Sequence, residues 1–453
     1  MGALFGTNGV RGITNSELTP ELALGLGKAI GTFYKAGSRI MVGRDIRAGG
    51  DMIVRALTSG LLSSGVQVDY AGVLPTPALQ YGIRKRQYDG GVMVTASHNP
   101  AEFNGIKVLG PDGVEAEAHV EEAIEKYYFS RKFREAKWQD LNRDVAMAPG
   151  VIDEYIKEIL SKVDAKRIRK RGFKVLIDGG NSVGSLASVR VAKELGCEVH
   201  EVATDLDPLF PSRPPEPTHA SLEKSAALVK RFGADIGVAH DGDADRAVFI
   251  DSQGRVQFGD RSGTLLAYWC SKKSGKAKNT VITPFSSSNL VEDFLGREGI
   301  KVKWTRIGSI HVSKAMLESG AIAGFEDNGG FAYPKHQRVR DGAMTFALML
   351  DFLASQDKSS AELFDMLPKY QTEKIKIPLT KGMDVGKILR KVKSKYKGVG
   401  KVVDTDNDGL KMVADGFWFI VRKSGTEPVL RISVEAKSRS VLYDTMRELK
   451  KLI

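Results

Sequence analysis

The sequence predicts an α/β protein in which three similar mixed α/β domains are followed by a smaller C-terminal α+β domain. Over the first three-quarters of the chain, apolar segments typical of strands alternate with helix-like segments, as in parallel α/β units. From about residue 369 the pattern changes to alternating polar and apolar residues with a basic helix, which favours an antiparallel sheet. At 453 residues the chain is long enough to form several cores.

The first domain is predicted over residues 1–150. Its strands are expected at three apolar segments, 39–42, 66–70 and 92–94. Amphipathic spacing predicts a helix over 51–64, and a charged helical stretch is expected from about 115 to 137.

The other three domains are predicted over residues 151–252, 253–368 and 369–453. Their strands are expected at 173–178 and 236–240 in the second, 280–283 and 321–324 in the third, and 374–378 and parts of 401–421 in the fourth. Each of the first three domains therefore sends a strand into a polar, glycine-rich loop.

The composition, with 42% hydrophobic and 27% charged residues, is that of a soluble globular protein. No apolar run is long enough to span a membrane, and we expect no signal segment at the start of the chain. Only Cys197 and Cys270 are present, which excludes a disulfide framework or a thiolate zinc site and favours a cytoplasmic location. The net charge of +12 favours an anionic partner without choosing among nucleic acid, a membrane surface and a phosphorylated metabolite.

A serine follows a predicted strand in the segment TASHNP at residues 95–100. The Asn-Pro pair ends regular structure there, and open α/β sheets bind ligands at the carboxyl ends of their strands. Alone, Ser97 is better explained as a capping residue. The other loops of the chain favour a functional role for it.

Asp241, Asp243 and Asp245 occupy alternate positions in the segment DGDADR at 241–246. Three such carboxylates can converge on one hard cation, and their oxygen ligands suit Mg²⁺. An EF-hand is excluded because Arg246 stands where that loop needs glycine and Ser252 where it needs a bidentate acid. A solvated acidic turn is the alternative, but clustered carboxylates after an apolar strand repel one another without a cation, so a metal site is predicted.

Two further loops lie in the last domain. Residues 404–409 (DTDNDG) imitate an EF-hand, yet strand patterns flank them and Asn-Asp-Gly favours a turn, which predicts a solvent-facing hairpin. Residues 422–428 (RKSGTEP) offer a guanidinium, hydroxyls and a flexible glycine that could cradle a phosphate. A plain tight turn explains their composition equally well.

Three weaker signals concern sugar and phosphate binding. The segment GFEDNGG at 324–330 has acids and an amide that could bind sugar hydroxyls. Arg11 lies in a glycine-rich turn, and Lys107, a few residues beyond Ser97, could shuttle a proton or clamp a phosphate. A lone lysine, however, is more often a solvated surface group.

Two apparent signals carry no function. Residues 25–31 (GLGKAIG) resemble a nucleotide-binding loop, but they sit in a helical pattern with the wrong glycine spacing. The basic clusters at 166–174 and 387–401 lack interleaved aromatic residues, so they are interpreted as solvated helix faces and no nucleic-acid partner is expected.

Taken together, the loops at 95–100, 241–246, 324–330 and 422–428 resemble, in this order, those of the α-D-phosphohexomutase family, which includes phosphoglucomutase/phosphomannomutase and phosphoglucosamine mutase. The resemblance covers essentially the whole chain. It implies a heart-shaped, four-domain isomerase with a central cleft to which each domain contributes one loop. Such an enzyme interconverts hexose 6-phosphate and hexose 1-phosphate through a phosphoserine and a sugar 1,6-bisphosphate.

The resemblance also implies roles for individual residues. Ser97 matches the phosphoserine, which would share a Mg²⁺ ion with Asp241, Asp243 and Asp245. The matches to catalytic cleft residues are Arg11, Lys107 and Arg246. The matches to substrate-binding residues are Glu326 and Asn328 for the sugar, and Arg422, Ser424, Gly425 and Thr426 for the non-reacting phosphate. The partners implied are sugar phosphates, bound by a monomer or a homodimer.

The sugar itself is less well defined. Many bacterial members have serine and histidine where this chain has Asn328 and Gly330, a form similar to the archaeal branch. Together with the loop at residues 5–12, this favours glucosamine phosphate, with glucose and mannose phosphates as the alternative and a pentose phosphate still open. Two other classes are retained: a metal-dependent sugar-phosphate phosphatase, which would release inorganic phosphate, and a nucleic-acid-binding protein, whose binding would depend on salt.

Overall fold

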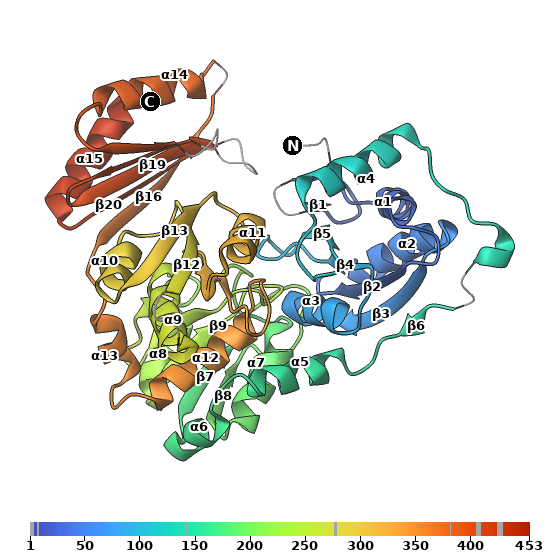
Figure 1. Cartoon of the computed structure of the whole chain (residues 1–453), viewed down its shortest axis with the longest axis horizontal. Helices are drawn as coiled ribbons and strands as arrows, with labels where there is room; N and C mark the ends of the chain where they lie inside the picture. Colours follow the sequence, from blue (N-terminus) through green and yellow to red (C-terminus); the bar gives the residue numbers. More distant parts are fainter. Residues whose placement is uncertain are drawn as a thin grey trace.

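The chain forms four β-sheets that follow one another along the sequence, each with its own helices (Figure 1). The computed structural model describes residues 4–6, 9–141, 144–275, 279–380, 382–404, 409–423 and 429–453. In Figure 1 the first sheet lies on the right in blue, the second and third lie at the lower left in green and yellow, and the fourth lies at the upper left in red. This architecture confirms the predicted fold class.

The first sheet has six strands in the order β1-β5-β4-β2-β3-β6. These strands are β1 (Val10–Ile13), β2 (Arg39–Arg44), β3 (Gln67–Val73), β4 (Gly90–Val94), β5 (Phe103–Leu109) and β6 (Ala146–Met147). β2 pairs in parallel with β3 and β4, as predicted, whereas β5 is antiparallel to both of its neighbours, β4 and β1. The link from β4 to β5 is too short for a crossover helix, so the chain turns back beside the strand it has just left.

The helices of this first unit cover its sheet. They are α1 (Pro20–Phe33), α2 (Gly50–Ser63), α3 (Thr76–Lys85), α4 (Ala118–Ser130) and the short 3₁₀ helix η1 (Trp138–Asp140). The helix predicted over 115–137 is wrong in extent, because Arg131 adopts a left-handed conformation (φ 53°) that ends α4 at Ser130.

The second sheet has the order β11-β10-β9-β7-β8. Its elements are β7 (Lys174–Asp178), β8 (Glu198–Val202), β9 (Ile236–Ala239), β10 (Val248–Asp251), β11 (Val256–Gln257), α5 (Val151–Leu160), α6 (Ala165–Arg171), α7 (Gly184–Glu194) and α8 (Glu223–Phe232). β9 is parallel to β7 but antiparallel to β10, so the aspartate loop closes a hairpin.

The third sheet has the order β13-β12-β14-β15, with β15 antiparallel to β14. Its elements are β12 (Asn279–Pro284), β13 (Ile300–Thr305), β14 (Ala323–Phe325), β15 (Phe331–Ala332), α9 (Gly259–Ser274), α10 (Leu290–Arg297), α11 (Ser309–Ser319), α12 (Gly342–Ala354) and α13 (Ser360–Asp365). The loop at 326–330 therefore also joins two antiparallel strands.

The fourth sheet is antiparallel throughout, as predicted, in the order β16-β20-β19-β18-β17. Its elements are β16 (Gln371–Pro378), β17 (Lys401–Asp404), β18 (Leu410–Ala414), β19 (Phe417–Lys423), β20 (Val429–Ala436), α14 (Val385–Lys395) and α15 (Arg439–Lys451). β17 and β18 pair as the arms of a hairpin, although residues 405–408 of the predicted turn lie outside the described part of the chain.

A single large core joins parts of the first three units. All thirteen residues of α12 are buried, and this helix packs against α5, α6, α7 and α9. The fourth unit has a separate core between its sheet and its two helices. Among the described residues, no helix combines the length and the apolar character needed to cross a membrane.

Candidate active site

Ser97 lies in the turn between β4 and β5, where its backbone adopts a left-handed conformation (φ 51°). This conformation is unfavourable for a residue with a side chain, so the surroundings must hold it in place. The Ser97 amide donates to the Thr95 hydroxyl at 2.9 Å, and that hydroxyl donates to the Asp45 carboxylate at 2.6 Å. The Ser97 hydroxyl in turn donates to Asp241 Oδ2 at 3.0 Å.

Arg47 is a residue that the sequence analysis missed, and it lies buried beneath this turn. Its guanidinium pairs with Asp45 at 3.2 Å. The same group donates to four carbonyl oxygens of the turn and its surroundings, at 2.6–3.0 Å, which belong to Ser97, Asn99, Pro100 and Phe103. The strained turn is therefore held by one planar group that matches several acceptors at once.

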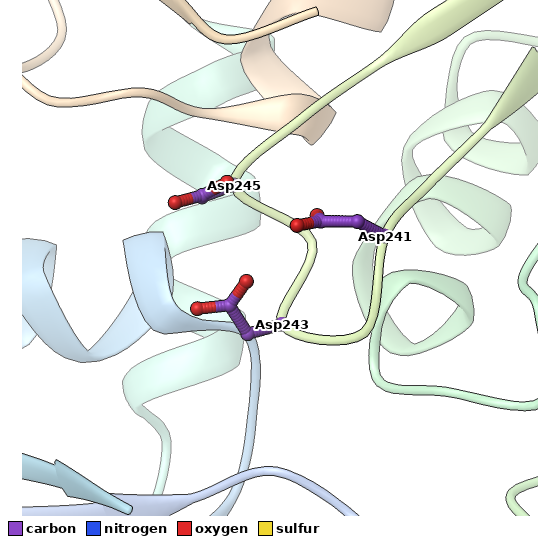
Figure 2. Close-up of side chains that lie close together, drawn as sticks. All are labelled: Asp241, Asp243 and Asp245. Atoms are coloured by element: carbon purple, nitrogen blue, oxygen red, sulfur yellow. The ribbon is translucent and has the colours of Figure 1, made fainter. Parts of the chain in front are cut away.

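The three aspartates of the β9–β10 loop point toward one another (Figure 2). One carboxylate oxygen from each of Asp241, Asp243 and Asp245 lies within 4.8 Å of the other two, and all three side chains are buried. The structure thus brings together the predicted metal ligands, and Asp241 connects them directly to Ser97.

The remaining hydrogen bonds of the triad leave oxygen atoms free for a cation. Asp243 Oδ2 accepts from Lys107 Nζ at 2.9 Å and from the Thr76 hydroxyl at 2.8 Å, while Asp245 Oδ2 accepts from Arg340. The opposite oxygens, Asp243 Oδ1 and Asp245 Oδ1, are buried without a hydrogen-bond partner among the described residues. Asp245 Oδ1 has only a long ion pair with Arg246 Nε, at 3.7 Å. Buried carboxylate oxygens without hydrogen bonds are costly, so this donor set fits a hard divalent ion.

Electrostatics support the same interpretation. Burial and the neighbouring charges of Asp245 and Asp243 raise the pKa of Asp241 to about 8. Burial opposes ionisation of Asp243 as well, but the Lys107 ammonium and its hydrogen bond lower the pKa of Asp243 below the usual range. A cation held by all three carboxylates would remove the repulsion that burdens Asp241.

Basic side chains surround Ser97. Arg11 donates to Asn99 Oδ1 at 2.6 Å, and its Nε and Nη2 atoms are buried without a hydrogen-bond partner in the described ranges. Arg246 donates to His98 Nδ1 at 2.9 Å, and its charge, with burial and Arg11, lowers the pKa of His98. His98 is therefore neutral, and the unpaired donors of Arg11 could bind an anion near this turn.

Lys107 occupies a more defined place than a lone lysine in a sequence suggests. It lies on β5, antiparallel to β4, and its side chain is only 2% exposed. A cavity of about 310 Å³ begins beside it and runs between the first and third units, where Gly308 and His311 form part of the opposite wall.

Glu326 of the predicted sugar loop lies close to the aspartate loop. Its carboxylate accepts from Arg340 at 3.0 Å, and Arg340 also bonds Asp245. The side-chain Oδ1 of Asn328 accepts from the Gly330 backbone amide at 3.0 Å and so shapes the loop itself. The structure therefore joins the sugar loop and the aspartate loop through Arg340, a residue that no motif had singled out.

The fourth unit also contacts the sugar loop. Lys374 on β16 bonds Asp327 at 2.6 Å. Burial opposes ionisation of Asp327, but Lys374 and, further away, Arg422 lower the pKa of this carboxyl group. Arg422 is half-buried at the end of β19. The predicted phosphate-binding residues Ser424, Gly425 and Thr426 lie outside the described residues.

Comparison with known proteins identifies the class. Four models of the phosphoglucomutase/phosphomannomutase family match successive parts of the chain: alpha/beta/alpha domain I over 2–135, domain II over 153–254, domain III over 258–370 and the C-terminal domain over 375–452. The protein is a phosphohexomutase, an isomerase of phosphorylated sugars. It belongs to the phosphoglucomutase/phosphomannomutase family, which confirms the predicted resemblance.

Individual relatives agree with this result. A phosphoglucosamine/phosphogalactosamine mutase of Sulfurisphaera tokodaii is 53% identical over 100% of this chain and 99% of its own length. A phosphoglucomutase/phosphomannomutase of Thermococcus kodakarensis is 43% identical over 97% of this chain and 95% of its own. A solved structure of a phosphoglucomutase/phosphomannomutase family protein from Burkholderia thailandensis has a TM-score of 0.87 at 26% identity, covering 99% of this chain and 96% of that one.

Proposed function

We propose that this phosphohexomutase carries its transferable phosphoryl group on Ser97 and interconverts glucosamine 6-phosphate and glucosamine 1-phosphate. The observation that carries the proposal is the position of the Ser97 hydroxyl, 3.0 Å from Asp241, in a turn whose residues His98 and Asn99 are bonded by arginines. A hydroxyl between a carboxylate triad and cationic donors suits phosphoryl transfer, in which positioning and charge neutralisation do most of the work.

The reaction balances as two transfers. In the first, the P–Oγ bond of phosphoserine 97 breaks, a P–O bond to the free sugar hydroxyl forms, and the hydroxyl proton ends on Ser97 Oγ. In the second, the 1,6-bisphosphate has turned around. The bond between its other phosphorus and the sugar oxygen breaks, a P–Oγ bond to Ser97 forms, and the Ser97 hydroxyl proton ends on that sugar oxygen. Lys107, which lies beside Asp243 at the cavity, is proposed to relay the proton.

Asp241, Asp243 and Asp245, with an oxygen of phosphoserine 97, are proposed to hold a Mg²⁺ ion. When bound, such an ion neutralises charge on the transferring phosphoryl group. Arg11 and Arg246 are proposed to bind the phosphoryl oxygens through their guanidinium donors. Since these groups face the turn that carries Ser97, they favour the charged, phosphorylated form of the serine.

The remaining loops are proposed to hold the sugar. Glu326 and Asn328 would bind ring hydroxyls, and Arg422 with residues 424–426 would bind the phosphate that is not reacting. Each of the four predicted domains, 1–150, 151–252, 253–368 and 369–453, would thereby contribute one loop. Energy from the distant phosphate can then be used to position the reacting one.

The choice of glucosamine phosphate rests on the Sulfurisphaera tokodaii relative, whose name includes phosphoglucosamine mutase and whose whole length matches this chain. Rates should be measured side by side on glucosamine, glucose and mannose 6-phosphates, with and without EDTA. We expect the highest kcat/KM on glucosamine 6-phosphate, and loss of turnover with EDTA that Mg²⁺ restores. A preference for glucose or mannose phosphate would support the dual-specificity alternative instead.

The same assays address the phosphatase alternative. A phosphatase would release inorganic phosphate from the sugar phosphate without forming the 1-phosphate isomer. We expect isomer formation with only trace release of phosphate, because the buried turn around Ser97 limits the approach of water.

A further inference from the structure

Arg340 bridges two functional loops that come from different sheets. Its side chain is 8% exposed, and its two terminal nitrogens take different partners. Nη2 bonds Asp245 in the β9–β10 loop, and Nη1 bonds Glu326 Oε2 in the sugar loop at 3.0 Å. A guanidinium stays protonated in folded proteins, so both bonds join a cation to a carboxylate.

The backbone around Arg340 is held rigidly. The next residue, Asp341, caps the buried helix α12 by accepting from Met344 N at 2.9 Å. Asp341 also accepts from the Tyr155 hydroxyl at 2.5 Å and from Gln337 at 2.7 Å. Arg340 therefore extends from a fixed base, and little reorganisation is needed to keep both of its carboxylates in place.

The sugar loop leaves room for this arginine. A Cβ atom added at Gly330 would overlap the Arg340 side chain, lying 2.9 Å from its Cγ and closer still to its Cδ. Gly330 also bridges to Arg246 of the aspartate loop, and the Ala247 amide donates to the Gly329 carbonyl at 3.0 Å. The two loops thus share backbone contacts as well as the guanidinium.

We infer that Arg340 is a positioning residue that couples the cation site to the sugar site. By holding Asp245 Oδ2, it leaves Oδ1 as the oxygen without a hydrogen bond, 3.7 Å from Arg246 Nε. By holding Glu326, it orients the carboxylate proposed to receive the sugar hydroxyls. Binding at either site then favours the arrangement that the other needs. The inference rests on the proposed roles of the triad and of Glu326.

The geometry of the guanidinium is the basis of this coupling. A planar fork with fixed donors can satisfy two carboxylates in one orientation, whereas a lysine ammonium keeps the charge on a flexible stem without that orientation. Arg340→Lys therefore separates geometry from charge. Arg340→Met removes both, and Arg338→Lys, at an exposed position two residues earlier, is the matched control.

The test measures binding and turnover together. Mg²⁺ affinity of the dephosphorylated protein is determined by titration calorimetry, and KM and kcat are determined with glucosamine 6-phosphate. For Arg340→Lys we expect Mg²⁺ affinity to fall about tenfold and KM to rise by a similar factor, as when a group that orients a metal ligand is lost. Arg338→Lys should change neither. A merely structural role would lower thermal stability and apparent kcat but leave the Mg²⁺ affinity and KM unchanged. That result would overturn the inference.

Glu326→Gln provides an independent readout. Glu326 is not one of the triad ligands, so a change of about fivefold in Mg²⁺ affinity is expected through the Arg340 bridge. The same substitution added to Arg340→Met should have no further effect on Mg²⁺ binding. If the Arg340 variants do not fold, Glu326→Gln alone decides: unchanged Mg²⁺ affinity contradicts the coupling. Failure of the wild-type protein to bind Mg²⁺ or to isomerise the sugar would instead contradict the proposed function.

Discussion

At the scale of single residues, the site depends on Ser97 occupying a backbone conformation that its side chain disfavours. The compensation comes from groups that carry no chemistry themselves. Asp45, Thr95 and Arg47 form a buried network under the turn, and its bonds would be lost if the turn relaxed. These bonds all come from the first unit, so it holds the backbone of the turn without a residue of the second unit.

Replacing Ser97 tests its role directly. Ser97→Ala should lower isomerase activity by several orders of magnitude, because the Thr95 hydroxyl is bonded to Asp45 and His98 Nδ1 to Arg246, so neither replaces the serine. The unfolding temperature should change by only a few degrees, and the phosphoserine should disappear from the mass spectrum. Ser59→Ala, on the exposed face of α2, is the control and should keep full activity. Wild-type rates in Ser97→Ala would rule out the phosphoserine mechanism.

Arg47 makes a prediction that concerns both stability and rate. Arg47→Met leaves Asp45 as an unpaired buried charge and several carbonyls without donors, at a cost of roughly 3–5 kcal/mol in the free energy of unfolding. Arg47→Lys keeps the charge but not the set of bonds to the turn. We expect kcat to fall more than KM rises, because this substitution displaces the Ser97 turn and leaves the sugar-binding residues in place. Denaturant unfolding and steady-state kinetics measure the two effects. Arg55→Lys, at an exposed position of α2, is the control and is expected to behave as wild type.

At the scale of elements, the site is built from short loops between antiparallel neighbours. The β4–β5 turn carries Ser97 and returns Lys107 on the adjacent strand, while the β9–β10 loop carries the aspartates. A short connection allows little movement, so strand pairing on both sides fixes the positions of these side chains.

Gly242 lies where the two loops meet. A Cβ atom there would overlap the Ser97 carbonyl oxygen and lie 3.3 Å from Arg47 Nη2, while the Gly242 carbonyl is held by the Ser182 hydroxyl at 2.5 Å. Gly242→Ala should therefore push the triad away from Ser97 and reduce kcat about 100-fold, the cost of a displacement near 1 Å.

The matched control for this substitution is Gly296→Ala in α10, where an added Cβ meets nothing within 4 Å. It should preserve activity and stabilise the helix by up to about 1 kcal/mol. Equal activity of Gly242→Ala and Gly296→Ala would show that the loop contact does not matter for catalysis.

At the scale of the whole molecule, the fourth unit has its own core and docks on the third through a buried polar cluster. Lys411 on β18 is 2% exposed, lies over the rings of Trp304 and Trp418, and donates to the Phe285 carbonyl at 2.8 Å. Burial lowers the pKa of Lys411 to about 8, although Glu435, Glu292 and Asp327 oppose this shift.

This docking predicts a pH dependence of stability. Between about pH 8 and the unfolded value of 10.5, the unfolded chain keeps the Lys411 proton that the folded chain releases, so the Lys411 contribution to stability rises with pH. In this range the Lys411 contribution to the free energy of unfolding should rise by on the order of 1 kcal/mol per pH unit.

The measurement compares wild type with Lys411→Met by thermal unfolding at pH 7.5, 8.5 and 9.5. Subtracting the stability of the variant from that of the wild type removes the contribution of Cys197 and Cys270, which is the same in both. Burial raises the pKa of these two thiols to about 12, so they destabilise the fold above pH 9. The wild type should gain stability relative to the variant as the pH rises. A constant difference would mean that Lys411 keeps its proton in the folded protein.

Much of this site was predictable from local patterns. Ser97 and the aspartate triad each sit directly after an apolar strand, and the topology of an α/β sheet carries such loops to one edge. Lys107 was predictable only as a candidate. It reaches Asp243 because β5 pairs antiparallel with β4, and its spacing from Ser97 in the sequence does not reveal that pairing.

Taken alone, the sequence determined the fold class, the order of the loops and the type of chemistry, since these depend on local periodicity and on residue types at short spacing. Only the tertiary structure decided which groups hold those loops. Arg47 lies 50 residues from Ser97, and Arg340 lies 95 residues from Asp245, so neither spacing carries a signal. Their roles arise because the ends of several strands and the start of the buried helix α12 lie close together. Long-range packing sets the distances there, and local sequence does not encode them.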